Sequence, residues 1–317
     1  MHLTDQEYWK VRNRLDVVSY GKLRDFTANP RAYKLGRAKE QSDPMIKGSL
    51  VDCLLFEPQA FFDRFEFRKE TDKNGEYALR SNAAKAEYKA IQERGRIPIK
   101  PDWATDALEQ VKAVHMSRDT KPAPWSVLRK DFDPKPYLDA LAEMIRTATP
   151  ITGLGDVLNG DAQLGVCRKL SANGVELSFC GKLDFRPGYG EYSDAIVDAK
   201  LITPGTLDSW ANKVNDMSYH WQAASYLDLD RWQNPDSSRT RFIWLLIENK
   251  FPFDCGLVQC SASAIEIGRA QYRKATERYF ECLRDDDWPS PYHTKDGAPA
   301  IVGLPDWAAN KAWREIA

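Results

Sequence analysis

Hydrophobic and polar residues in the first half of the chain are spaced as in amphipathic helices. One helix is expected over 21–28, where Ser19 can cap the first turn. The Asn29-Pro30 pair should end it, because the residue before a proline avoids the helical region. Further helices are predicted at 46–57, 83–94, 103–115 and 137–148. The N-terminal part of the chain is therefore predicted to be mostly α.

From residue 162 the pattern changes to the two-residue alternation of β-strands. Strands are expected over 162–170 and 175–185, joined by a tight turn at Asn173-Gly174, and a buried third strand over 194–202. A helix at 218–232, strands at 241–250 and 255–261 and a long helix at 268–284 complete the predicted order. This mixed order of elements predicts an α/β fold, with a mixed central β-sheet flanked by helices and a helical N-terminal elaboration.

The length and composition suit one large folded unit. The 317 residues are 43% hydrophobic, which is ample for a sizeable core. We expect a single domain over 1–317, with a mostly helical part at 1–150 and an α/β core and C-terminal helix at 151–317, without a firm boundary between them. No apolar run approaches the roughly 20 residues that cross a bilayer, and the first residues lack the apolar stretch of a signal peptide, so a cytoplasmic location is expected.

The cysteines give no sign of a metal site or a disulfide framework. None belongs to a CxxC pair, and several lie in apolar segments such as VDCLLF and LSFC. We expect all six to be reduced residues of the core: Cys53, Cys167, Cys180, Cys255, Cys260 and Cys282.

The net charge of −1 gives the whole molecule no general attraction for a polyanion. A nucleic-acid surface would therefore require local segregation of charge, and residues 1–40 carry nine Lys or Arg against five acidic residues. An ordinary solvated helical face would produce the same count, so charge alone leaves both interpretations open.

Two charged residues interrupt the predicted buried strand 194–202. Asp198 and Lys200 are two residues apart, so the alternation of a strand places both side chains on one face. Asp184 lies near the end of the preceding strand, and antiparallel pairing would bring the two carboxylates together. Paired carboxylates suit Mg²⁺, which keeps waters and bridges to phosphate oxygens, while the lysine could orient or deprotonate an attacking water. The pattern therefore predicts phosphodiester hydrolysis.

A lone DxK pattern on a strand has a simpler explanation, a surface ion pair worth about 0–1 kcal/mol. Here the pair lies inside the apolar run IVDAKLI, where unpaired charges are costly to bury, and a second aspartate ends the preceding strand. Charged groups retained in such surroundings favour the functional interpretation.

Several segments resemble a known family when they are taken in order: SYGKLRDFTANPRAY, KGSLVDCLLFEP, GKLDF, VDAK and YHWQAASY, followed by IENKFPF, GRAQYR and LPDW. Their order and spacing resemble the RecE-type and lambda-exonuclease-like branch of the PD-(D/E)XK nucleases, enzymes of phage and prophage recombination that include the YqaJ-like viral recombinase group. The resemblance runs along most of the chain. It implies a restriction-endonuclease-like core.

The resemblance also implies roles for individual residues. Asp184 and Asp198 would be metal ligands, joined by the backbone carbonyl of Ala199, and Lys200 would be the catalytic lysine. Gln222 and Tyr226 match a QxxxY helix motif that meets the metal site or DNA, and their i,i+4 spacing places them on one helical face. Routine core packing would explain the same Gln–Tyr spacing.

Two positions depart from the family pattern. Many relatives have His where this chain has Asp52, so either a carboxylate replaces the imidazole as a metal ligand or that contact is lost, and we favour the carboxylate. Relatives often carry Glu at the start of the first core strand, where this chain has Gln163, which cannot supply a charge. Glu176 on the next strand is a candidate to compensate.

The activity implied by the resemblance is a magnesium-dependent exodeoxyribonuclease, with Mn²⁺ as a substitute. Such an enzyme enters at a double-strand end, degrades the 5′ strand and leaves a 3′ overhang for a single-strand annealing protein. The resemblance further implies a ring-shaped homo-oligomer, a trimer rather than a tetramer, in the bacterial host of a phage or prophage. Four arginines are candidates to grip phosphates: Arg12, Arg14, Arg24 and Arg31.

Other functions stay open at this point. An endonuclease could use the same core, although the cysteines do not match the iron–sulfur quartet of nucleases of the CRISPR-adaptation type. A degenerate fold that binds DNA ends or a recombination partner without cutting is kept open by Gln163 and Asp52. The intact Asp184, Asp198 and Lys200 weigh against it. A structural phage component would bind neither metal nor DNA ends.

Overall fold

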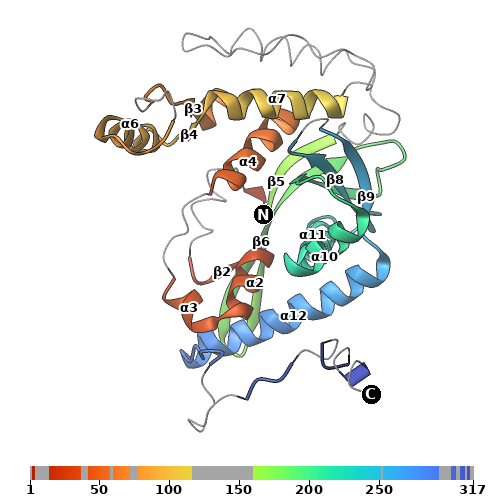
Figure 1. Ribbon diagram of the computed structural model, residues 1–317. Helices are drawn as coiled ribbons and strands as arrows, with labels where there is room; N and C mark the ends of the chain where they lie inside the picture. The colour runs from red at the N-terminus through yellow and green to blue at the C-terminus, as the bar shows by residue number, and fades with distance from the viewer. Residues whose placement is uncertain are drawn as a thin grey trace.

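The computed structural model describes residues 2–3, 14–36, 42–57, 60–71, 77–115, 160–250, 253–292, 301–304, 308–310 and 313–314. A mixed β-sheet forms the centre of the fold, with helices on both of its faces, as the sequence predicts (Figure 1). The predicted helix at 137–148 lies outside the described residues. No helix in the described part of the chain is long and apolar enough to span a membrane.

The large sheet has seven strands, in the order β1-β5-β6-β7-β8-β9, with β2 pairing β6 outside this path. Its strands are β1 (His2–Leu3), β2 (Val17–Val18), β5 (Gly160–Ala172), β6 (Val175–Pro187), β7 (Ala195–Ile202), β8 (Arg241–Glu248) and β9 (Cys255–Gln259). Pairing is antiparallel except for β7 with β8 and β2 with β6. The central strands β7 and β8 are covered on both faces, which explains their nearly continuous hydrophobic sequences.

The β5–β6 hairpin forms around the turn that the sequence predicts. Asn173 and Gly174 both have positive φ, 52° and 78°, as a two-residue hairpin turn of the I′ type requires. From this turn the register runs in step along both strands, from Ala172 opposite Val175 to Gly160 opposite Pro187. The hairpin therefore sets which residues of β6 face which residues of β5.

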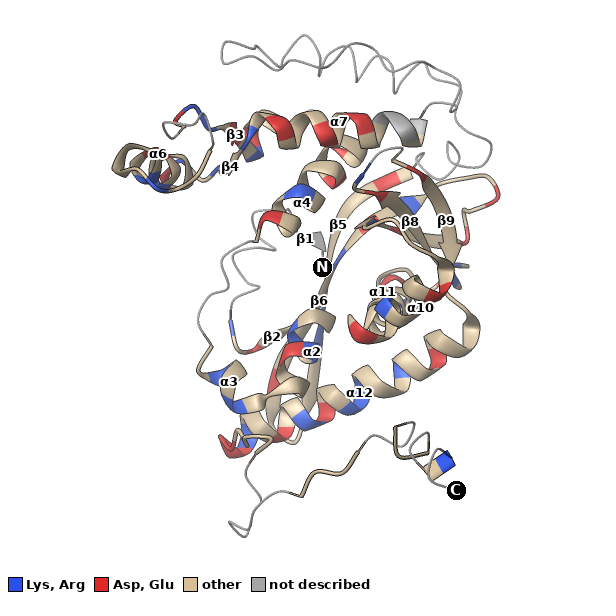
Figure 2. Cartoon of the chain, in the orientation of Figure 1, with Lys and Arg blue, Asp and Glu red and all other residues tan. Residues whose placement is uncertain are grey.

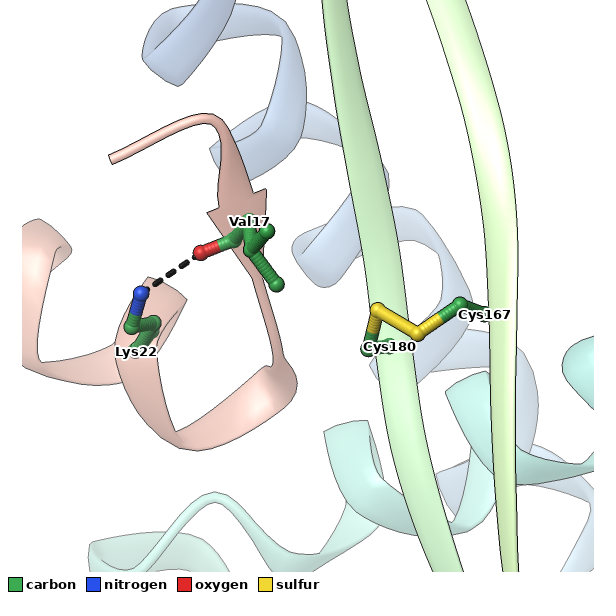
Figure 3. The surroundings of a disulfide bond; sticks show 4 residues. All are labelled: Val17, Lys22, Cys167 and Cys180. Atoms are coloured by element: carbon green, nitrogen blue, oxygen red, sulfur yellow. Dashed lines mark hydrogen bonds between the residues drawn. A yellow bond between two sulfur atoms is a disulfide. The ribbon is translucent and has the colours of Figure 1, made fainter. Parts of the chain in front are cut away.

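This register corrects one expectation about the cysteines. Cys167 and Cys180 lie directly opposite each other with Cα atoms 4.1 Å apart, and they form a disulfide rather than two thiols (Figure 3). Val17 of β2 packs against the pair. Two cysteines at facing positions of adjacent strands are close enough to bond. The other four lie outside the disulfide, and Cys53, Cys260 and Cys282 are buried as expected.

Each face of the sheet has its own hydrophobic core. On one face pack α2 (Tyr20–Ala28), α10 (Leu207–Asp216), α11 (Tyr219–Gln233) and α12 (Ala262–Asp285). On the other face pack α4 (Asp43–Phe56) and α7 (Pro101–His115). Figure 1 shows these two groups of helices on either side of the strands. The sheet therefore separates α4 from α2 and α11.

Several short elements were not anticipated. They are α3 (Pro30–Lys34), α5 (Phe61–Arg64), the parallel pair β3 (Phe65–Phe67) and β4 (Ile97–Ile99), and the helix α10. In contrast, α6 (Asn82–Glu93) matches the helix predicted at 83–94. Pro30 does end α2, but it also begins α3, because Asn29 caps the new helix through the N–H of Ala32 and proline is tolerated in the first turn.

Candidate active site

The candidate site lies where β6 and β7 separate. The two strands share one pair of facing residues, Phe185 with Val197, whereas β7 pairs with β8 along its whole length. In an antiparallel register the next facing positions are Asp184 and Asp198. The sheet thus brings the two predicted carboxylates to the first positions beyond the last shared pair.

The hairpin bends at the same point. Leu183 packs in the core on the α11 side, whereas Phe185, two residues later, packs in the core on the α4 side. Opposite the intervening Asp184, Gln163 has a φ of 53°, and these two residues form no regular pair although their neighbours do. A non-glycine residue in this conformation is strained, and such strain is common beside functional sites. Because of the bend, the side chain of Asp184 does not follow the regular alternation between the two faces of the strand.

Asp184 then completes the hydrogen bonding of β7. Its Oδ2 accepts a hydrogen bond of 3.1 Å from the backbone N–H of Ala199, in place of the missing strand partner. The N–H and C=O of one strand residue point to the same edge of the strand. The carbonyl of Ala199 consequently faces the β6 side, where the two strands have separated.

Asp198 is almost completely buried, at 1% exposed. Its Oδ2 forms an ion pair with the ammonium of Lys200, and its Oδ1 accepts a 2.6 Å hydrogen bond from Nε2 of Gln222 on α11. The other amide atom of Gln222, Oε1, is buried and accepts no hydrogen bond from any described residue. The first residue of the QxxxY motif therefore contacts the metal-ligand candidate directly and keeps one spare acceptor.

Lys200 is held among aromatic rings. Its Nζ lies 5.0 Å from the centre of the Tyr219 ring, and Tyr20 of α2 is a close electrostatic neighbour. Burial by itself lowers the pKa of Lys200, but Asp198, Tyr20, Asp184 and Tyr219 together outweigh it and raise the pKa above the usual value. Burial also raises the pKa of Tyr20 to about 12, so its hydroxyl stays protonated.

Asp52 joins the site from the opposite helical layer. Burial raises its pKa to about 7, and the charges of Lys200 and Asp198 are the next largest influences on it. The pKa of Asp184 is also raised well above its usual value by burial and by the charges of Asp198 and Asp52. The three carboxylates therefore share one electrostatic environment, in which negative charge exceeds what the nearby cations offset at Asp184 and burial raises the pKa of Asp52.

Lys182 is a site residue that sequence reasoning missed. Its positive charge acts on both Asp52 and Asp184, and it precedes Asp184 by two residues on β6. The segment GKLDF indicates it, because Lys182 lies two residues before Asp184 and would share its face in a regular strand.

The donor set fits a hard divalent cation. Among the described residues no three His, Cys, Asp or Glu side chains gather closely enough to enclose a metal by themselves. Mg²⁺ does not need such a cage, because it is usually held by one or two carboxylates with waters and substrate phosphate completing its shell. Asp184, Asp198 and the carbonyl of Ala199 form a set of this kind, and the excess negative charge around Asp184 is what a cation would offset.

The remaining predicted residues are placed less directly. Tyr226 is buried one turn beyond Gln222, where it packs edge-on against Tyr20 in the hydrophobic core. Glu176 is exposed near the hairpin turn, far along β6 from Asp184, so it does not compensate for Gln163. The proposed compensation is therefore wrong.

The four candidate arginines are not equivalent. Arg24 of α2 acts electrostatically on Tyr20 and Tyr219, and its Nη1 reaches the carbonyl of Met217 at 3.5 Å. Arg14 pairs with Asp16, and Arg31 is exposed on α3. Arg12 lies outside the described residues. Figure 2 shows basic and acidic residues interspersed on α2 and α12, whereas the charged residues of the short helix α3 are basic.

Together, the forked sheet, the paired carboxylates and the adjacent lysine define a fold and site of the PD-(D/E)XK class. A scan against family models matches residues 17–293 to the PDDEXK-like domain of unknown function (DUF3799), and the chain belongs to this family. This confirms the superfamily and the fold class predicted from the sequence.

Comparison with solved structures supports the same fold. A chain from Eubacterium rectale described as a "Putative exonuclease" matches with a TM-score of 0.54 and 14% sequence identity. The match covers 98% of this chain and 99% of that one. No curated protein matches the chain. At this identity the likeness concerns the fold alone.

Proposed function

We propose that the protein is a magnesium-dependent exodeoxyribonuclease that degrades the 5′ strand of duplex DNA and leaves 3′ overhangs. The observation that carries the proposal is the arrangement of Asp184, Asp198 and Lys200 where β6 and β7 separate. Acidic pairs with an adjacent lysine match the needs of phosphodiester hydrolysis, in which negative charge must be offset and a water activated.

In this proposal Asp184, Asp198 and the carbonyl of Ala199 hold Mg²⁺ or Mn²⁺, with Asp52 as a further carboxylate. The bound ion lowers the pKa of a coordinated water and offsets charge on the scissile phosphate. Lys200 keeps its proton while it is paired with Asp198, so its first role is to orient the attacking water and to stabilise negative charge on the phosphate. Gln222 holds Asp198 in place through its amide N–H.

The polarity and the biological role rest on the resemblance described above. The same resemblance supports a ring-shaped homo-oligomer, with a trimer favoured over a tetramer, and a single-strand annealing protein as partner. Arg24 is the arginine best placed to contact a DNA phosphate near the site, because it acts on the two tyrosines around Lys200. Gln222 and Tyr226 would support the site from α11.

The decisive experiment is digestion of a linear duplex labelled at the 5′ end of one strand and the 3′ end of the other. We expect magnesium-dependent release of the 5′ label, no reaction in EDTA, and a loss of about 1,000-fold in Lys200→Ala. Lys169→Ala, on the exposed part of β5, is the matched control and should leave the rate unchanged. A closed circular duplex, which has no ends, should remain intact.

Two other outcomes would redirect the proposal. Cutting of the closed circle would identify an endonuclease on the same core. Intact DNA under every condition, with folded protein, would favour a protein that binds DNA ends or a recombination partner without cutting. The neutral Gln163 opposite Asp184, and the fact that no three acidic side chains in the described chain enclose a metal, are the observations that favour this second function.

A further inference from the structure

The ring of Tyr219 contacts Lys200, although the QxxxY motif gives roles only to Gln222 and Tyr226. The ammonium lies 5.0 Å from the ring centre, within the range over which a cation is attracted to the negative face of an aromatic ring. Lys200 is mostly withdrawn from water, with a side chain 16% exposed, so the attraction is weakly screened. The ring is thus a second partner for the ammonium besides Asp198.

The backbone and the packing hold Tyr219 at this place. Ser218, the residue before α11, adopts a left-handed conformation with a φ of 55°, which turns the chain so that Tyr219 begins the helix beside β7. The Tyr219 ring stacks on Trp210 with centres 5.6 Å apart, and Trp210 packs edge-on against Trp244 of β8. Trp210 and Trp244 therefore hold the Tyr219 ring in place next to Lys200.

Asp198 has two roles. It pairs with Lys200, and it is also the carboxylate that the proposed function assigns to a cation. A carboxylate shared with a divalent ion attracts the lysine less, so the ammonium needs a partner that does not compete for the ion. A neutral aromatic ring meets this requirement, since it attracts the ammonium without adding a negative ligand.

We propose that Tyr219 is a positioning residue that holds the Lys200 ammonium over its ring and so keeps it directed at the reacting phosphate. This inference rests on the proposed nuclease function for its catalytic consequence, but the contact itself can be measured without metal or DNA. The hydroxyl of Tyr219 is not required, because the ring face supplies the attraction.

Activity distinguishes this role from simple packing. Tyr219→Leu is expected to lower kcat by about 5-fold to 30-fold with little change in KM, whereas Tyr219→Phe stays within about 2-fold of the wild type. Phenylalanines with one, two or three ring fluorines at position 219 keep nearly the same shape but progressively weaken the negative ring face. We expect kcat to fall stepwise along this series, which a packing role would not produce.

A matched control is available in the loop before β7. Tyr192 also lies beside a cation, with its ring centre 5.6 Å from Cζ of Arg241, but it belongs to no part of the proposed site. The same fluorinated series at Tyr192 should leave kcat unchanged. A flat series at Tyr219 in an enzyme that cuts DNA would overturn the positioning role, while leaving the nuclease function intact.

The contact is tested separately by NMR of lysine ε-methylene groups in metal-free protein. Protons held over a ring face are shifted upfield, so wild type and Tyr219→Phe should show a shifted Lys200 signal, assigned by its loss in Lys200→Arg. Tyr219→Leu should lack this signal. Absence of the shift in wild type would overturn the inference whether or not the protein cuts DNA. Its presence in a protein that cuts no DNA would support the contact and refute only the nuclease.

Discussion

Two groups of buried charges include neighbouring residues of β6, Arg186 in one group and Asp184 in the other. The groups differ in how completely their charges are paired. Around Asp230, which is 1% exposed, one oxygen accepts from Arg186 at 2.9 Å and the other from Ser237 at 2.6 Å, and Arg186 also binds Asp161. Around Asp198, equally buried, burial and mutual repulsion raise the pKa of the neighbouring carboxylates. The first group is internally balanced, because Arg239 also pairs with Asp230, whereas the second has surplus negative charge at Asp184.

This difference separates structural from functional charge. A balanced buried network fixes the positions of β5, β6 and the end of α11, and its removal should cost stability. A surplus of carboxylates costs stability in the absence of a ligand, so its retention is best explained by a ligand that it receives. Substitutions in the first group should therefore mainly lower stability, and substitutions in the second group should mainly lower activity.

The largest expected effect is on catalysis. Asp184→Asn should reduce DNA hydrolysis by at least about 100-fold, because a ligand and its charge are lost. Its free energy of unfolding without metal should stay equal or rise, since a carboxylate with a raised pKa is replaced by a neutral group that can still accept from Ala199. Initial rates on the labelled duplex and urea unfolding in EDTA measure the two quantities. A large loss of stability in this variant would contradict a functional rather than structural role for Asp184.

The opposite behaviour is expected at Asp230. Asp230→Asn should lower the free energy of unfolding by about 3 kcal/mol or more, because Arg186 then loses its buried carboxylate partner and keeps only the exposed Asp161. Activity per folded molecule should change little at a temperature where the variant remains folded. Asp161→Asn is the matched control: its side chain is 65% exposed, so its pair with the same arginine should contribute only about 0–1 kcal/mol.

The disulfide should stabilise both groups alike, since it joins the strands on which they are built. Reduction of Cys167–Cys180 should lower the free energy of unfolding by about 2–3 kcal/mol, mainly by giving the unfolded hairpin more freedom. The decrease should be equal in wild type, Asp184→Asn and Asp230→Asn. A Cys167→Ser, Cys180→Ser double variant should no longer respond to reductant, and a response there would point to another thiol.

The smallest contrast is expected in the pH dependence of the metal-free protein. Asp52 has a pKa of about 7 in the folded state against an ordinary value of 3.8, so the folded state binds more protons between these values. Stability in EDTA should therefore fall as the pH rises from about 4 to about 7. Water that reaches this half-buried side chain will weaken the effect. Asp52→Asn should flatten the slope, and an unchanged slope would show that Asp52 ionises normally.

The sequence determined much of the site because its alternation is local. Asp198 and Lys200 share a strand, Asp184 ends the strand before, and Gln222 follows on a helix, so their convergence follows from strand order and register. Tyr219 could also have been found, since it lies one helical turn before Gln222 and hence on the same side of the helix. The turn at Asn173-Gly174 likewise sets Cys167 opposite Cys180, each six residues from the turn.

What only the tertiary structure decided depends on contacts between distant segments. The bend at Gln163 and Asp184, the approach of Asp52 from α4 and the role of Tyr226 in the core arise because two helical layers close on opposite faces of one sheet. No local pattern reports which face a helix will cover, since that choice is made by the packing of the whole core. The sequence thus determines which charges lie on which strand, and tertiary packing determines which of those charges remain unbalanced.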